Sequence, residues 1–159
     1  MHNKFIIFVL LKYNMKREET IDYSIKASWH AISRMYNQQA SKFDMTTSIG
    51  FVLINIHSEL GTAATKIAPM MGLESRSLTR MLKSMEEKGL IYKKPDLEDK
   101  RSVRIFLTEE GHRKKLVSVD TVLKFNNKIY DTIDPEKLKI FFEVIGEINE
   151  IIDDNNIYK

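Results

Sequence analysis

A single glycine, Gly72, separates two short segments with helical periodicity, residues 63–71 and 75–88, and no other feature constrains the fold as much. Glycine readily adopts the left-handed conformation that ends a helix and turns the chain sharply. Ser75 stands where it can cap the second segment. Pro69 removes a backbone donor, so we expect the first segment to kink there or to end early. Two short helices joined by a tight turn predict a helix-turn-helix.

The second of these segments has two contrasting faces. At about 100° per residue its basic side chains fall within an arc of roughly 60°, opposite its apolar side chains. The apolar face comprises Leu78, Met81, Leu82 and Met85, and the basic face comprises Arg76, Arg80 and Lys83, with hydroxyls close by at Ser75, Ser77 and Thr79. Such a helix can enter a major groove, where arginine bonds guanine and hydroxyls bond bases or phosphates. Taken alone, the pattern fits a solvated basic face equally well.

Two predicted strands, residues 91–94 and 103–107, follow directly and are joined by the polar loop 95–102. This pattern predicts a β-hairpin with an extended tip, a wing. Its basic side chains are Lys93, Lys94, Lys100, Arg101 and Arg104. An arginine at the tip can enter a narrow minor groove, and Asp99 can orient it. The alternative for that pair is a surface ion pair worth about 0–1 kcal/mol. A helix-turn-helix followed by a basic hairpin favours DNA binding more than either part alone.

Four longer helices are predicted around this central region. They span about residues 20–39, 46–60, 108–130 and 135–152. The N-cap positions are occupied by Thr46, Thr108 and Asp134, with Pro135 at a first helical position. The second helix presents Ile49, Val52, Leu53, Ile56 and Leu60 on one face and ends at Gly61. The predicted fold class is mainly α with a β wing.

The central segments resemble the MarR-type winged helix-turn-helix transcriptional regulators. The motifs that carry the resemblance are Met71-Gly72-Leu73, Ser77-Leu78-Thr79-Arg80, Met85-Glu86-Glu87-Lys88-Gly89-Leu90-Ile91, and the run from Asp99 to Gly111, which contains a D-x-R wing and a leucine-threonine-x-x-glycine helix start. Two departures are the Tyr92-Lys93-Lys94 segment, where the family often has an arginine, and Pro69 before the turn. Lysine preserves phosphate contact but lacks the bidentate geometry of arginine.

The resemblance implies a homodimer that binds double-stranded DNA, most simply as a repressor. Residues 46–111 would form the winged DNA-binding domain, and residues 15–45 and 112–159 the intertwined dimerisation helices. Each recognition helix would lie in a major groove. In each wing, Arg101 would enter the minor groove and Asp99 would orient it. The alternative function is a winged-helix module that binds proteins and not DNA, although the basic face of residues 75–88 argues against it.

The terminal helices are expected to serve dimerisation and, by resemblance, effector binding. Trp29, Tyr36 and the apolar stripe of residues 138–152 offer more apolar surface than one thin domain covers, with intramolecular packing as the alternative. Family members are often switched by small aromatic molecules that bind where the dimer helices meet the DNA-binding lobe. The candidate ligand-binding residues are Trp29, Tyr36, Phe51 and His57, and ordinary core packing is the alternative for each.

Charge distribution and absent motifs narrow the function further. Residues 62–104 hold 10 Lys/Arg and 6 Asp/Glu, whereas residues 131–159 hold 3 and 8, so the middle suits a polyanion and the tail does not. The chain has no cysteine, which excludes a thiol sensor and fits a reducing, cytoplasmic setting. The histidines, His2, His30, His57 and His112, form no metal motif. We expect no enzyme, metal or cofactor.

The amino terminus carries an apolar run, residues 5–11. A membrane span needs about 20 such residues, so the run is too short to be one. Residues 1–14 are interpreted as an accessory packing segment, or as the result of a start codon set upstream of Met15. A regulator tethered to a membrane through this run is a weaker hypothesis.

Overall fold

The computed structural model describes residues 16–96, 102–154 and 157. The chain forms two compact units, the first ending at Ser118 and the second beginning at Val119, inside one long helix. Residues 1–14 therefore lie outside the described part of the chain, and their predicted roles stay predictions. The proposed division into residues 15–45 with 112–159, and residues 46–111, also stays a prediction.

The first unit opens with a short 3-10 turn, η1 (Arg17–Glu19), and a long helix, α2 (Ile21–Ser41). The helix α3 (Thr47–Asn55) follows a tight turn. The Thr46 hydroxyl accepts the backbone N–H of Ile49 at 3.3 Å, which confirms the predicted cap. The Asn37 side-chain oxygen accepts from the backbone N–H of Thr47 at 3.0 Å and thereby fastens α2 to the start of α3.

The prediction that the second helix runs to residue 60 is wrong. The backbone is already extended at Ile56, and Nδ1 of His57 accepts the backbone N–H groups of Glu59 and Leu60 at 3.2 and 3.0 Å. Those bonds stabilise a turn in place of another helical turn, so the local side-chain acceptor prevails over the apolar periodicity. Leu60 consequently lies on the surface, 65% exposed.

The helix-turn-helix consists of α4 (Ala64–Met70) and α5 (Ser75–Glu87). Gly72 adopts the predicted left-handed conformation, with φ at +60°, and Leu73 N–H closes the turn on the Ala68 carbonyl at 3.0 Å. Pro69 lies inside α4, which ends one residue later. The prediction that Ser75 is the N-cap is wrong: Glu74 occupies that position without a side-chain cap, and Ser75 is the first helical residue.

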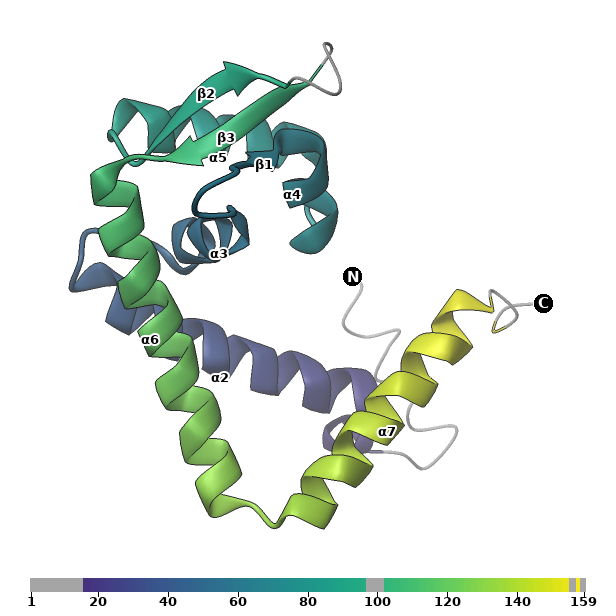
Figure 1. Ribbon diagram of the computed structural model, residues 1–159. Helices are drawn as coiled ribbons and strands as arrows, with labels where there is room; N and C mark the ends of the chain where they lie inside the picture. The colour runs from purple at the N-terminus through teal and green to yellow at the C-terminus, as the bar shows by residue number, and fades with distance from the viewer. Residues whose placement is uncertain (1–15, 97–101, 155–156, 158–159) are drawn as a thin grey trace. The chain divides into compact units, whose positions relative to one another are not determined.

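The wing belongs to a three-stranded antiparallel sheet of order β1-β3-β2 (Figure 1). The strands β2 (Ile91–Pro95) and β3 (Val103–Leu107) form the predicted hairpin, with Ile91 opposite Leu107. The third strand, β1 (Thr62–Ala63), was not predicted, because two residues are too short to show a period. It pairs with the edge of β3 that faces away from β2, with Ala63 opposite Arg104.

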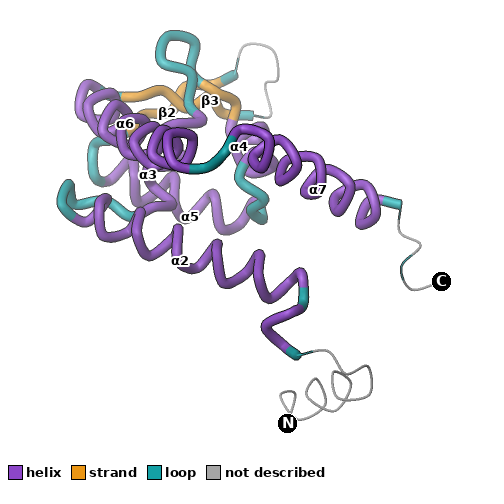
Figure 2. Tube along the Cα trace, turned by 90° about the horizontal axis from the view of Figure 1, so that it is seen from below, coloured by secondary structure: helices purple, strands orange, loops and turns teal. Residues whose placement is uncertain are grey.

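The last two helices start at the predicted caps. The Thr108 hydroxyl accepts the Gly111 N–H at 3.0 Å, at the start of α6 (Glu109–Thr132). The Asp134 carboxylate accepts the N–H of Glu136 at 2.9 Å, and Pro135 opens α7 (Pro135–Asp153). Figure 2 shows these helices in purple, turned by 90° from Figure 1.

The core of the first unit lies between α3, α4, α5 and the sheet. Its fully buried side chains are Val52, Leu53, Ile56, Ile67, Met85, Ile91 and Ile105. The predicted apolar face of α5 contributes to it through Leu78, Leu82 and Met85, while Met81 is only partly buried. Burial of each such side chain stabilises the fold by about 1.5–3 kcal/mol, so the orientation of α5 is strongly determined.

Candidate nucleic-acid interface

Helix α5 presents its basic face to solvent, as its periodicity predicts. Arg76, Arg80 and Lys83 are exposed, while the opposite apolar face is buried against the sheet and α4. Among the described residues, neither Arg76 nor Arg80 has an ion-pair partner. Lys83 lies 3.9 Å from Glu87, with both side chains mostly exposed, and such a pair constrains the ammonium group weakly. The three cations are therefore available to a polyanion.

The predicted hydroxyls of α5 are also exposed. They belong to Ser75, Ser77 and Thr79. The Thr79 hydroxyl donates to the Ser75 carbonyl at 2.8 Å, so its proton is used within the helix. Its oxygen can still accept a hydrogen bond, and serine hydroxyls can both donate and accept. These groups lie in the first turns of α5, the part of a recognition helix that approaches bases.

The two wing lysines on β2 have different environments. Lys93 Nζ lies 2.6 Å from a Glu86 carboxylate oxygen, so it ties the hairpin to α5. Lys94 is exposed, and its ammonium group lies 5.4 and 5.3 Å from the ring centroids of Tyr92 and Phe106, which stack on each other. A cation held over aromatic faces keeps its charge in a defined place on the surface.

Arg104, on β3, is engaged within the protein. Its Nε donates to a carboxylate oxygen of Asp96 at 3.1 Å, and a terminal nitrogen donates to the Leu60 carbonyl at 3.3 Å. The Asp96 side chain is only 2% exposed and that of Arg104 is 24% exposed. The guanidinium group therefore bridges the hairpin and the loop that precedes β1.

The three remaining wing residues of the predicted interface, Asp99, Lys100 and Arg101, lie outside the described residues. In the sequence they stand between Asp96 and Ser102. The backbone N–H of Asp96 donates to the Ser102 carbonyl at 3.1 Å, which closes the neck of the β2–β3 hairpin. The described residues on either side of the D-x-R motif are therefore held together.

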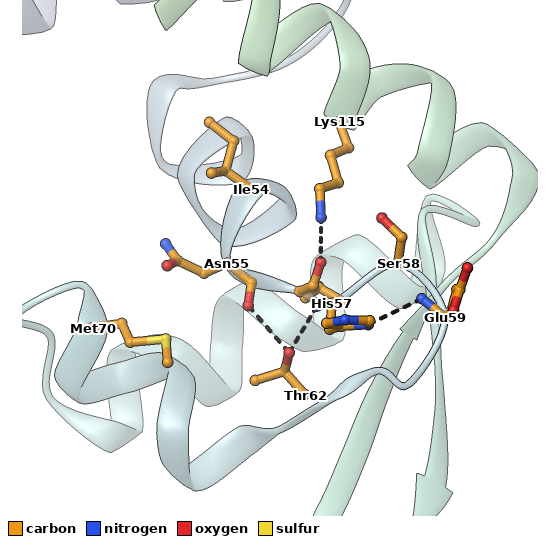
Figure 3. A pocket seen from close by; sticks show the side chains of 9 residues that line it. Ile54, Asn55, His57, Ser58, Glu59, Thr62, Met70 and Lys115 are labelled. Atoms are coloured by element: carbon orange, nitrogen blue, oxygen red, sulfur yellow. Dashed lines mark hydrogen bonds between the residues drawn. The ribbon is translucent and has the colours of Figure 1, made fainter.

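A pocket of about 710 Å³ lies at the end of α3 (Figure 3). Its lining is drawn from α3, the loop before β1, β1 itself, α4 and α6, and comprises Ile54, Asn55, Ile56, His57, Ser58, Glu59, Thr62, Met70 and Lys115. The Lys115 ammonium group donates to the Ile56 carbonyl, and burial lowers the pKa of this lysine. Thr62 joins the two sides of the loop by donating to the Asn55 carbonyl at 3.1 Å.

The four predicted ligand-binding residues do not form one site. Trp29, Tyr36 and Phe51 form an aromatic cluster between α2 and α3, with ring centroids 6.5 and 5.9 Å from that of Phe51. Tyr36 is buried, which raises its pKa. His57 instead lines the pocket described above. Sequence reasoning missed Lys115, because its contact with the Ile56 carbonyl spans 59 residues and leaves no local pattern.

In residues 16–96, 102–154 and 157, no group of three or more His, Cys, Asp or Glu side chains is arranged to hold a metal ion. Within the same part of the chain, no helix has the length and apolar character needed to cross a membrane.

Comparisons of sequence place these features in a family. The model of the MarR family matches residues 45–103. The organic hydroperoxide resistance transcriptional regulator of Bacillus subtilis (strain 168) is 34% identical over 107 residues, which cover 67% of this chain and 73% of the relative. The regulator TtmR of Methylorubrum extorquens is 32% identical over 89 residues, 56% of this chain and 46% of the relative.

Comparisons of structure agree on the fold. The S. aureus MepR–DNA complex superposes with a TM-score of 0.76 at 20% identity and covers 82% of this chain and 97% of that one. CouR from Rhodococcus jostii, bound to p-coumaroyl-CoA, gives a TM-score of 0.71 at 20% identity over 82% and 92%. The reduced form of MarR from E. coli gives 0.66 at 21% identity over 81% and 96%. The chain belongs to the MarR family of winged-helix transcriptional regulators.

Proposed function

We propose that this regulator is a homodimeric repressor that binds a pseudo-palindromic operator in double-stranded DNA. The observation that carries the proposal is the exposed basic face of α5, formed by Arg76, Arg80 and Lys83, beside a basic hairpin. A helix with buried apolar and exposed basic faces is suited to a major groove, and a basic hairpin to the adjacent backbone or minor groove. A protein with this proposed function would work in the cytoplasm.

The proposed contacts fall into two groups within a DNA-binding domain of residues 46–111. In the major groove they are Ser75, Arg76, Ser77, Thr79, Arg80 and Lys83. From the wing they are Lys93, Lys94, Lys100 and Arg101, with Asp99 orienting Arg101. The Tyr92-Lys93-Lys94 segment supplies point charges that suit phosphates better than base edges. Base edges are then read mainly by Arg76 and Arg80.

Exposed apolar side chains support the homodimer. On α2 they include Ile21, Ile25 and Trp29, and on α7 they include Ile140, Phe141, Phe142, Val144, Ile151 and Ile152. Large apolar patches on a soluble chain mark surfaces that a partner covers. A two-fold dimer built from residues 15–45 and 112–159 would place its recognition helices about 34–36 Å apart, one turn of B-DNA. That spacing selects a pseudo-palindrome.

We propose that a small aromatic ligand causes the protein to dissociate from its operator. CouR, which shares the fold, is described as bound to p-coumaroyl-CoA. In this chain the pocket beside His57 and Lys115 and the aromatic cluster of Trp29, Tyr36 and Phe51 are the candidate places for it. A ligand acts only through its different affinities for the DNA-binding and non-binding conformations. Because this chain has no cysteine, hydroperoxide cannot act on it through a thiol.

The proposal is tested by fluorescence anisotropy on the duplex upstream of the protein's own gene. A scrambled duplex of equal length serves as the control, and both are titrated at several salt concentrations. We expect tighter binding to the native duplex, with two protomers per site. Equal and steeply salt-dependent binding to both duplexes would reduce the result to electrostatic affinity. Binding to neither would favour the alternative, a winged-helix module that contacts proteins.

A further inference from the structure

Arg104 differs from Arg76 and Arg80 because its guanidinium group is bound by other residues of the protein. It contacts the buried Asp96 carboxylate at 3.1 Å and the Leu60 carbonyl at 3.3 Å. Arg76 and Arg80 are exposed by comparison. A cation with less than a quarter of its side chain exposed is poorly placed to neutralise a phosphate.

These bonds of Arg104 join three segments of the chain. Arg104 belongs to β3, Asp96 follows the last residue of β2, and Leu60 lies in the loop before β1. Next to Leu60, Gly61 packs so closely on β3 that an added Cβ would lie 2.6 Å from the Ile105 carbonyl oxygen. The guanidinium group and Gly61 therefore hold the same loop against the same strand.

Asp96 is the partner that makes this arrangement specific. Its side chain is 2% exposed, and a buried carboxylate is costly unless it is paired. Its backbone N–H bonds the Ser102 carbonyl at the neck of the wing loop. The fork of arginine reaches a carboxylate and a carbonyl at once, which the single ammonium group of lysine does less well. The ion pair therefore lies at the neck of the hairpin, where Asp96 is bonded to Ser102.

We propose that Asp96 and Arg104 form a positioning pair that holds the neck of the β2–β3 hairpin against the loop before β1, and that Arg104 supports DNA binding through the placement of this hairpin without touching DNA. The proposal rests on the DNA binding proposed above. It makes Arg104 a positioning residue, and it assigns a role in operator binding to a buried acidic side chain, Asp96.

Whether replacement of Asp96 raises or lowers operator affinity distinguishes a positioning role of Arg104 from direct contact with DNA. Asp96→Ala and Asp96→Asn each remove one negative charge from the DNA-binding unit. If Arg104 contacted DNA, both variants would bind the operator as tightly as the wild type or more tightly, because the guanidinium group is released and repulsion falls. If the pair positions the wing, Asp96→Ala weakens operator binding. Asp96→Asn weakens it less, because the amide oxygen still accepts from Arg104.

The experiment measures operator affinity by anisotropy for the full chain and these variants. Glu109→Gln, at an exposed acidic position on α6, is the matched charge control. We expect about a tenfold loss for Asp96→Ala, which corresponds to about 1.4 kcal/mol. Asp96→Asn should fall between it and the wild type, and Glu109→Gln should show no loss. Asp96 variants that bind as tightly as Glu109→Gln would overturn the proposal.

A charge-conserving variant distinguishes a loss of operator binding from a loss of folding. Arg104→Lys keeps the net charge and leaves a cation at the strand, yet it loses the fork that bridges Asp96 and Leu60. We expect it to weaken operator binding while the thermal unfolding midpoint stays close to that of the wild type. Unchanged operator affinity in Arg104→Lys would point to a simple point charge and overturn the positioning role.

A measurement without DNA separates this proposal from the proposed function. In amide hydrogen exchange of the unliganded protein, Asp96→Ala should speed exchange at residue 96, whose N–H bonds Ser102, and leave the α5 amides unchanged. If the wild type shows no operator preference but this acceleration is seen, the proposed function fails and the positioning of the neck stands. No acceleration at residue 96 would overturn the positioning pair whatever the DNA result.

Discussion

At the scale of single residues, several positions are determined by close contacts and not by polarity. Gly111, in the first turn of α6, lies directly against the backbone of Leu90, where an added Cβ would lie 2.0 Å from the carbonyl oxygen. Thr108 bonds both the Gly111 N–H and the Gly89 carbonyl, the latter at 2.6 Å. The leucine-threonine-x-x-glycine pattern is therefore a packing requirement between the end of the wing and the helix that follows it.

Replacement of Gly111 by alanine is expected to lower the free energy of unfolding by about 1–3 kcal/mol, because the methyl group must displace backbone. Urea denaturation measures the change. Gly146→Ala is the matched control, since no described atom lies within 4 Å of the added Cβ in α7. That variant should gain up to about 1 kcal/mol from helix propensity. Equal effects of the two variants would contradict the packing argument.

At the scale of secondary-structure elements, α5 and the wing have separable roles in binding. The orientation of α5 follows from its buried apolar face. The basic side chains on its other face are exposed and make few contacts with the rest of the described protein. The wing is tied to α5 through the ion pair of Lys93 with Glu86 and to the loop before β1 through Arg104. We therefore expect substitutions in α5 to change sequence preference and substitutions in the wing to change affinity on most sequences.

Arg80→Ala is expected to cost about 1–3 kcal/mol of discrimination at one base position if Arg80 reads a base edge. Anisotropy on a set of single-base operator variants measures this loss. Lys139→Ala, an exposed cation on α7, controls for the loss of one charge. Equal weakening of Arg80→Ala on all sequences would instead identify a phosphate contact.

Arg101→Ala is expected to weaken operator binding and to flatten its salt dependence, with the slope of log K against log salt reduced by about 1 per wing. The measurement is a salt titration of affinity for the variant and the wild type. A variant with unchanged affinity and slope would refute the assignment of Arg101 to the minor groove.

At the scale of the whole molecule, the exposed apolar side chains on α2 and α7 bear on whether the protein associates with a second copy. Trp29 is 52% exposed and Phe141 and Phe142 are 54% and 56% exposed. The basic middle and acidic tail of the chain would leave the dimer helices as the part kept away from DNA. In the proposed homodimer, the spacing of the two recognition helices would depend on how these surfaces pair.

Phe141→Glu is expected to shift the protein toward monomer, because it buries a carboxylate in the proposed interface. Light scattering after size exclusion, over a range of concentrations, measures the shift. Lys139→Glu places the same carboxylate on the polar face of α7 and should leave the dimer intact. Operator affinity should fall with the dimer fraction in Phe141→Glu alone. A wild type that is monomeric throughout would contradict the homodimer.

The sequence alone determined the faces of α5, the hairpin, and the helix starts at Thr46, Thr108 and Asp134, because periodicity and capping depend on residues a few positions apart. The tertiary structure decided the early end of α3, the pairing of β1 with β3, the partners of Arg104 and the lining of the pocket. Arg104 meets Leu60 across 44 residues, and Lys115 meets Ile56 across 59. Contacts over such separations depend on how the elements pack, and no local pattern encodes them.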